Sequence, residues 1–234
     1  MQVCFSATKS MVLCGHKQQP RPYTKSTHMR TSIWFVRHGQ TELNKARRYQ
    51  GITNSPLTPY GQQQAHALAH RLQRIPFRTV IVSPSQRAQE TAEIIVAERS
   101  IPFVDDTQWA ETNHGCWEGL TYREVTQRFP REAASRFADP LNGRATDGES
   151  LAEVMQRVMA GWQNILQKLP GGRVLVVTHA TPIQLVLCAI SSMSPDLHWR
   201  WRIDLGSVTS IDIYGGSPIV RVVNEVPKLL SKSS

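Results

Sequence analysis

The sequence predicts an α/β protein: a three-layer sandwich with a mostly parallel central sheet flanked by helices. Three short, mostly apolar runs, at 33–36, 79–82 and 174–177, are typical of strands that are buried on both faces of a sheet. Amphipathic segments with helical spacing separate these runs along the chain. Strands that alternate with helices in this way favour parallel strands joined by helical crossovers.

The helices that follow the first two strands are predicted from their caps and their apolar spacing. Thr58 and Pro59 open one helix, because Thr is a favoured N-cap and Pro fits the first helical turn. Ser83 and Pro84 break the second strand, and apolar residues along one face predict another helix over residues 85–98.

The middle of the chain is less regular. Scattered Gly and Pro over residues 105–148 leave room only for short helices near 121–129 and 131–138. A capping box at Ser150 and Glu153 then starts a long amphipathic helix. The elements expected after the third strand are a helix over 180–192 and a hairpin of strands over 208–214 and 219–226.

Length and composition narrow the class of protein. The 234 residues are 40% hydrophobic and 19% charged, which suits one sizeable globular domain rather than a disordered chain. The longest apolar runs, such as residues 185–190, are far shorter than the roughly 20 residues that span a bilayer. We therefore expect no membrane partner.

The net charge of +9 is concentrated at the amino end. Residues 1–31 hold five basic and no acidic side chains, which leaves +4 for the rest of the chain. We expect a disordered extension over 1–31, a folded domain over 32–227 and a flexible tail over 228–234. The extension resembles an organellar transit peptide, but translation from upstream of a true start at Met29 accounts for it as well. No nucleic-acid partner is expected, because over half of the basic excess lies outside the domain.

The cysteines exclude two further classes. They stand at positions 4, 14, 116 and 188 with no CxxC spacing, so neither a zinc framework nor a disulfide scaffold fits. A reducing compartment is the default for such a chain, and we expect a cytoplasmic protein.

Charged side chains follow each of the three predicted strands. Arg37 and His38 come directly after the first, Arg87 after the second and His179 after the third. Because ligands bind beyond the carboxyl ends of parallel strands, we expect two His and two Arg at one edge. Guanidinium groups would repel a metal cation but pair well with the oxygens of a phosphate dianion, and an imidazole can attack phosphorus.

Six sequence blocks, in order, carry a family resemblance. They are Arg37 to Thr41, Gly51 to Ala65, Ser83 to Ala92, Glu111 to Gly119, Gly148 to Ser150 and Thr178 to Ala180. In these blocks the chain resembles the histidine phosphatase superfamily, also called phosphoglycerate-mutase-like, from about Ile33 to Val226. The resemblance implies the same α/β fold and no metal or other cofactor.

The resemblance also implies a role for each matched residue. His38 would be the nucleophile that becomes phosphohistidine, Glu111 the proton donor to the leaving group, and His179 the second histidine of the phosphate pocket. The residues implied for phosphate binding are Arg37, Asn44, Arg87 and Ala180. Ala180 stands where the family generally has Gly, and its small side chain still lets the backbone N–H approach phosphate.

Other polar residues near these blocks have more than one interpretation. Glu118 is an alternative to Glu111 as the acid, although we expect it to cap or pair near the following helix. His114 is expected either at the rim of the substrate site or on the surface. His66 and His70 share a helix face at metal-ligand spacing, but no third ligand is in sight, so a solvated face is expected.

The function predicted is hydrolysis of small phosphorylated metabolites by a metal-independent phosphomonoesterase through phosphohistidine. The alternatives are a cofactor-dependent phosphoglycerate mutase, an alpha-ribazole-phosphate phosphatase, and an inactive module that binds a phosphorylated ligand. The expected partner is the small phosphorylated substrate, and the sequence leaves undecided whether the protein forms a homodimer. Residues 117–148 are expected to be the only cover over the pocket, which favours an open site and hydrolysis.

Overall fold

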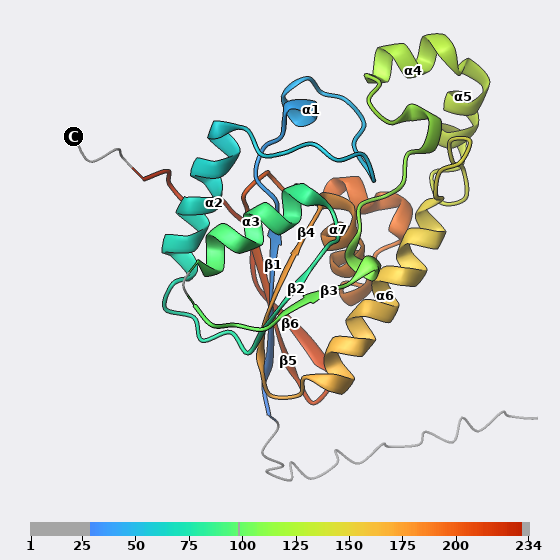
Figure 1. Ribbon diagram of the computed structural model, residues 1–234. Coiled ribbons are helices and arrows are strands. Elements are labelled where there is room, and N and C mark those ends of the chain that lie inside the picture. Colours follow the sequence, from blue (N-terminus) through green and yellow to red (C-terminus); the bar gives the residue numbers. More distant parts are fainter. Residues whose placement is uncertain (1–28, 98, 231–234) are drawn as a thin grey trace, which may run out of the picture.

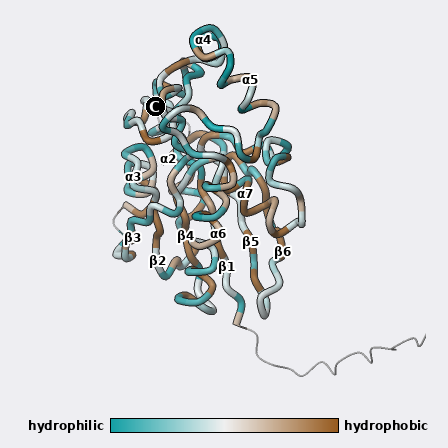
Figure 2. The backbone as a smooth tube through the Cα atoms, turned by 90° about the vertical axis from the view of Figure 1, so that its right-hand side faces the viewer, coloured by the Kyte–Doolittle hydropathy of each residue, from teal (hydrophilic) through white to brown (hydrophobic). Residues whose placement is uncertain are grey.

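The computed structural model describes residues 29–97 and 99–230, which form a six-stranded sheet with helices on both faces. The strand order is β3-β2-β4-β1-β5-β6, and Figure 2 shows the strands side by side in this order. Strands β1 to β4 pair in parallel, whereas β5 runs antiparallel to both β1 and β6. Their bounds are β1 Thr31–Arg37, β2 Thr79–Val82, β3 Phe103–Asp105, β4 Arg173–Thr178, β5 Val208–Tyr214 and β6 Ser217–Glu225.

Helices complete the three layers that the sequence predicts (Figure 1). The α-helices are α1 Glu42–Lys45, α2 Pro59–Leu72, α3 Gln86–Val96, α4 Tyr122–Arg128, α5 Pro130–Ala138, α6 Leu151–Lys168 and α7 Ala180–Ile190. The 3-10 helices are η1 Thr107–Trp109, η2 Gly115–Trp117 and η3 Pro195–Arg200. The predicted α/β class and the predicted hairpin are thereby confirmed.

Alternation along β1 shows how the sheet acquires two buried faces. Ile33 and Phe35 pack against α6 and α7, while Trp34 and Val36 belong to the core under α2 and α3. Burial on both faces explains why the central strands carry consecutive apolar residues at 33–36, 80–82 and 174–177. A third, smaller core around Trp117 holds α4 and α5 together above the carboxyl ends of the parallel strands (Figure 1).

Three short elements differ from the sequence prediction. Strand β3 has only three residues, all of them exposed, and backbone pairing to β2 holds it at the sheet edge. Helix α1 has only four residues. Helix η3 follows α7 after a short turn and reaches the cavity described below.

Parts of the predicted termini lie outside the described residues, namely 1–28 of the extension and 231–234 of the tail. Between them, none of the helices that the structure describes is both long and apolar enough to cross a bilayer.

Candidate active site

The two predicted histidines meet at the carboxyl edge of the sheet. His38 follows β1 and His179 follows β4, and these strands are neighbours. Their ring centroids lie 5.0 Å apart, and both side chains are buried. Gly39 allows this turn to pass close to α2, because a Cβ there would collide with the carbonyl of Gly61. The parallel topology therefore brings the two imidazoles into one buried pocket.

Arg87 lies between the two imidazoles. Its Nε is 3.2 Å from His38 Nε2, and its Nη2 is 3.2 Å from His179 Nδ1. The same guanidinium donates to the carbonyls of Gly51 and Thr53, at 2.7 and 3.2 Å. Burial lowers the pKa of Arg87 to about 10, so the group is still a cation at neutral pH. A cation in this place favours an anionic ligand over a metal ion.

Hydrogen bonds assign a tautomer to each histidine. His38 Nδ1 lies 2.7 Å from the Gly39 carbonyl, so Nδ1 carries the proton and the lone pair is on Nε2. His179 Nε2 lies 2.7 Å from the Ser83 hydroxyl and donates to it when Nδ1 accepts from Arg87. His38 is thus oriented as a nucleophile through Nε2.

Burial is the main cause that lowers the pKa of His38 and of His179 well below the ordinary value, and the Arg87 charge lowers both further. Both imidazoles are therefore neutral in the folded protein at neutral pH. In the unfolded chain they would bind protons near pH 6.5. Since unfolding then takes up protons, the stability that these groups support is present above about pH 6.5 and is lost as the pH falls.

We expect the free energy of unfolding to fall between pH 7.5 and 5.5, by up to about 1.4 kcal/mol per pH unit for each buried histidine. Urea unfolding at several pH values measures this slope. A His179→Asn variant should show a shallower slope, because one buried imidazole is removed. His66→Gln, on the exposed face of α2, is the matched control and should keep the wild-type slope. Equal slopes in all three proteins would contradict the expectation.

The other predicted phosphate ligands lie around this pair in different ways. Arg37 donates through Nη1 to the Ile203 carbonyl at 2.7 Å, and its buried Nε has no partner among the described residues. Ala180 is the first residue of α7, where free backbone N–H groups suit an anion. Asn44 uses its Oδ1 to accept from the Thr41 backbone in the capping box of α1, which leaves Nδ2 as its donor.

Glu118 stabilises the loop that Arg87 contacts. Its carboxylate accepts the backbone N–H groups of Gly51, Ile52, Thr53 and His114 at 2.9–3.2 Å. Burial acts to raise the pKa of Glu118, but these hydrogen bonds outweigh it and hold the pKa below its ordinary value. The expected cap near the following helix is wrong, because Glu124 supplies the capping box there. Because these donors favour the deprotonated carboxylate, Glu118 is poorly suited to hold the proton that a general acid must donate.

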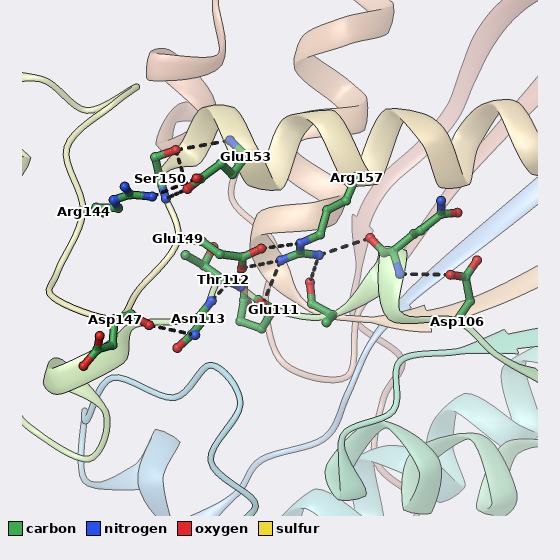
Figure 3. Close-up of polar contacts among 12 residues, drawn as sticks. Asp106, Glu111, Thr112, Asn113, Arg144, Asp147, Glu149, Ser150, Glu153 and Arg157 are labelled. Atoms are coloured by element: carbon green, nitrogen blue, oxygen red, sulfur yellow. Dashed lines mark hydrogen bonds and ion pairs between the residues drawn. The ribbon is translucent and has the colours of Figure 1, made fainter.

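Glu111 lies in the loop after η1, and its charge acts on both Arg37 and Arg87. Arg157 of α6 holds this loop (Figure 3). It donates to the carbonyls of Gln108, Ala110 and Glu111 at 3.1, 2.6 and 2.9 Å. It also forms a bidentate pair with Glu149, at 2.8 and 2.9 Å.

Glu149 holds the other side of the loop that contains Glu111. Its Oε2 accepts the backbone N–H of Asn113 at 2.9 Å, two residues after Glu111. The backbone on both sides of Glu111 is therefore fixed by one ion pair, whose side chains are 19% and 27% exposed. Figure 3 shows this pair between α6 and the loop. The sequence interpretation assigned no role to Arg157.

We expect Arg157→Lys to lower kcat/KM on alkyl phosphates by roughly 10- to 100-fold, because Lys cannot replace the planar fork and the Glu111 carboxyl would shift. The loss should be smaller on p-nitrophenyl phosphate, whose leaving group needs little protonation. The matched control is Arg144→Lys, which changes an exposed pair with Glu153. An equal loss on both substrates would indicate a general effect on folding instead.

A cavity of about 390 Å³ is lined by residues next in sequence to two of the predicted site residues. Thr112 and Thr181, which line it, follow Glu111 and Ala180 directly in sequence. His114 also lines it. The expectation that residues 117–148 alone cover the site is incomplete, because η3 supplies a further wall. Outside the site, His66 and His70 are exposed, and no group of three metal-ligating side chains occurs among the described residues.

Known proteins match nearly all of the folded part of the chain. A family profile described as histidine phosphatase superfamily (branch 1) matches residues 33–226. An adenosylcobalamin/alpha-ribazole phosphatase of Salmonella typhimurium is 30% identical over 82% of this chain and 95% of its own length. The structure of the alpha-ribazole phosphatase from Shigella flexneri has a TM-score of 0.80 at 27% identity, covering 86% of this chain and 100% of that one.

A longer relative also matches. A bifunctional protein of Mycobacterium tuberculosis is 36% identical over 83% of this chain. The match takes in 54% of that protein, so this chain spans about half the length of that relative.

Proposed function

The chain belongs to branch 1 of the histidine phosphatase superfamily, and on that premise we propose that it hydrolyses phosphomonoesters through a phosphohistidine at His38, without a metal ion. One observation carries the proposal. The Nε2 lone pair of His38 lies in a buried pocket beside the Arg87 guanidinium, with Nδ1 held by the Gly39 carbonyl. A nucleophile and a phosphate-binding cation are thus placed together before substrate arrives.

In the first step, the His38 Nε2 lone pair attacks phosphorus and the bond from phosphorus to the leaving oxygen breaks. Glu111 gives its proton to that oxygen, so the leaving group departs as a neutral alcohol. Arg37 and Arg87 neutralise the charge on the three phosphoryl oxygens. A phosphate dianion beside His179 favours its protonated form, which gives the pocket a further donor.

In the second step, water attacks phosphorus and the bond to His38 Nε2 breaks. The Glu111 carboxylate takes a proton from the water, which returns the enzyme to its starting state. The backbone N–H groups at the start of α7 and the Nδ2 of Asn44 would bind the oxygens of inorganic phosphate until it leaves.

The mutase alternative differs from hydrolysis in how the phosphoenzyme is treated. A mutase must exclude water until the product is rephosphorylated. We expect that 3-phosphoglycerate either releases inorganic phosphate or does not react, and that 2,3-bisphosphoglycerate has no effect. Phosphate release and 2-phosphoglycerate formation are measured in the same mixture. Efficient interconversion of the two phosphoglycerates with negligible phosphate release would contradict hydrolysis while leaving the His38 chemistry intact.

A panel of phosphomonoesters with and without chelator tests the proposal as a whole. Turnover of p-nitrophenyl phosphate that survives chelator is the expected result. Alpha-ribazole phosphate belongs in the panel because two of the relatives act on it by name. Absence of phosphate release from every ester would contradict the proposed function.

A further inference from the structure

The lining of the 390 Å³ cavity includes Thr112 and Thr181, which directly follow Glu111 and Ala180 of the proposed site in sequence. An in-line attack by His38 sends the leaving oxygen away from the imidazole and toward the proton donor. Glu111 is followed by Thr112, and Thr112 lines the cavity. This adjacency makes the cavity the candidate site for the part of the substrate beyond the leaving oxygen.

Aromatic side chains from separate elements form its walls. Tyr49 and Trp117 pack with a centroid distance of 5.6 Å, and Trp117 is only 3% exposed, so these two belong to the local core. Phe137 of α5 and Trp199 of η3 differ, because they are 49% and 66% exposed although they line the same cavity. Large exposed aromatics that face one concave site from two elements are typical of a ligand-binding surface.

The charges on the cavity wall balance. Arg136 and Asp196 carry opposite charges. Burial is the main cause that lowers the pKa of His114 and of His198, so both are neutral near pH 7. The wall thus offers no net attraction to a leaving group that carries a carboxylate. Arg136 donates to the Pro140 carbonyl at 2.6 Å through Nη1, and its planar guanidinium suits stacking on a flat ring.

From these observations we propose that the substrate is the phosphomonoester of an uncharged alcohol that carries a planar aromatic ring, and that Phe137 and Trp199 bind this ring. The inference rests on the proposed function, because it assigns the leaving group of that same reaction. The size of the cavity agrees with it: about 390 Å³ is comparable to sites for drug-sized ligands and exceeds what a three-carbon leaving group fills.

Three substrates with similar aliphatic leaving oxygens separate ring recognition from general hydrophobicity: 2-phenylethyl phosphate, 2-cyclohexylethyl phosphate and glycerol 1-phosphate. We expect kcat/KM to be at least about tenfold higher for the phenyl ester than for the glycerol ester, and several-fold higher than for the saturated ring. Trp199→Ala should lower kcat/KM for the phenyl ester by about tenfold and change the glycerol ester less than about twofold.

Tyr214→Ala removes an exposed aromatic from the β5–β6 hairpin, outside the cavity, and should leave all three values unchanged. Equal kcat/KM for the phenyl and cyclohexyl esters, or a Trp199→Ala loss that is the same on all three esters, would overturn the assignment of an aromatic leaving group while hydrolysis itself stands. If none of the three esters nor p-nitrophenyl phosphate is hydrolysed, the proposed function fails, and this inference with it.

Discussion

His38→Ala is expected to lower turnover of every phosphomonoester by on the order of 10⁴-fold or more, because the covalent route is lost. The imidazole is buried, and its hydrogen bonds to the Gly39 carbonyl and to Arg87 fix Nε2 in the pocket, so alanine leaves no nucleophile at this position. Steady-state kinetics with p-nitrophenyl phosphate and with glycerol 1-phosphate measure the loss.

Two controls keep this result interpretable. His70→Ala removes an exposed imidazole from α2 and should retain wild-type kinetics. The folding of His38→Ala is checked by its melting temperature and by whether it still binds inorganic phosphate, since the two arginines and His179 are intact. A folded His38→Ala protein with near-normal turnover would remove the proposed mechanism.

Glu111→Gln is expected to give the second largest effect, and the effect should depend on the leaving group. Turnover of glycerol 1-phosphate should fall by roughly 10²- to 10⁴-fold, since an alkoxide leaves poorly without a proton. With p-nitrophenyl phosphate the first step needs no acid, so the variant should release one equivalent of p-nitrophenol rapidly and then turn over slowly. Stopped-flow absorbance resolves the two phases.

Glu118→Gln is the matched control for the choice of carboxylate. Its amide nitrogen would face backbone N–H donors of the Gly51–Thr53 loop, so we expect lower stability and a similar loss on both substrates. If Glu118→Gln instead showed the loss that depends on leaving group, Glu118 and not Glu111 would be the acid.

The pairing of His38 with His179 could be predicted because it follows from one rule of sheet topology. Each residue follows a strand that contains an apolar run, and the carboxyl ends of neighbouring parallel strands meet at one edge. The same rule placed Arg87, which lies in the first turn of the helix after β2. The long helix after Ser150 was predictable as well, since Ser150 and Glu153 form a capping box within four consecutive residues.

Contacts between distant segments could not be predicted in the same way. Arg157 lies among polar residues of an amphipathic helix, and nothing local distinguishes it from a solvated arginine; its carbonyl partners lie 46–49 positions away. Glu118 likewise bonds a loop 65–67 positions earlier. One signal was available and overlooked: Thr121 and Glu124 have capping-box spacing, which already gives the following helix its cap and frees Glu118.

The most direct test of the account is to trap the phosphoenzyme. Glu111→Gln protein is mixed with p-nitrophenyl phosphate and denatured in alkali, where phosphohistidine survives, and the phosphorylated peptide is identified by mass spectrometry. The account predicts one phosphoryl group, lost in acid, on His38 and on no other residue. Phosphorus on a different side chain, or wild-type hydrolysis by a protein that never carries phosphorus, would contradict it.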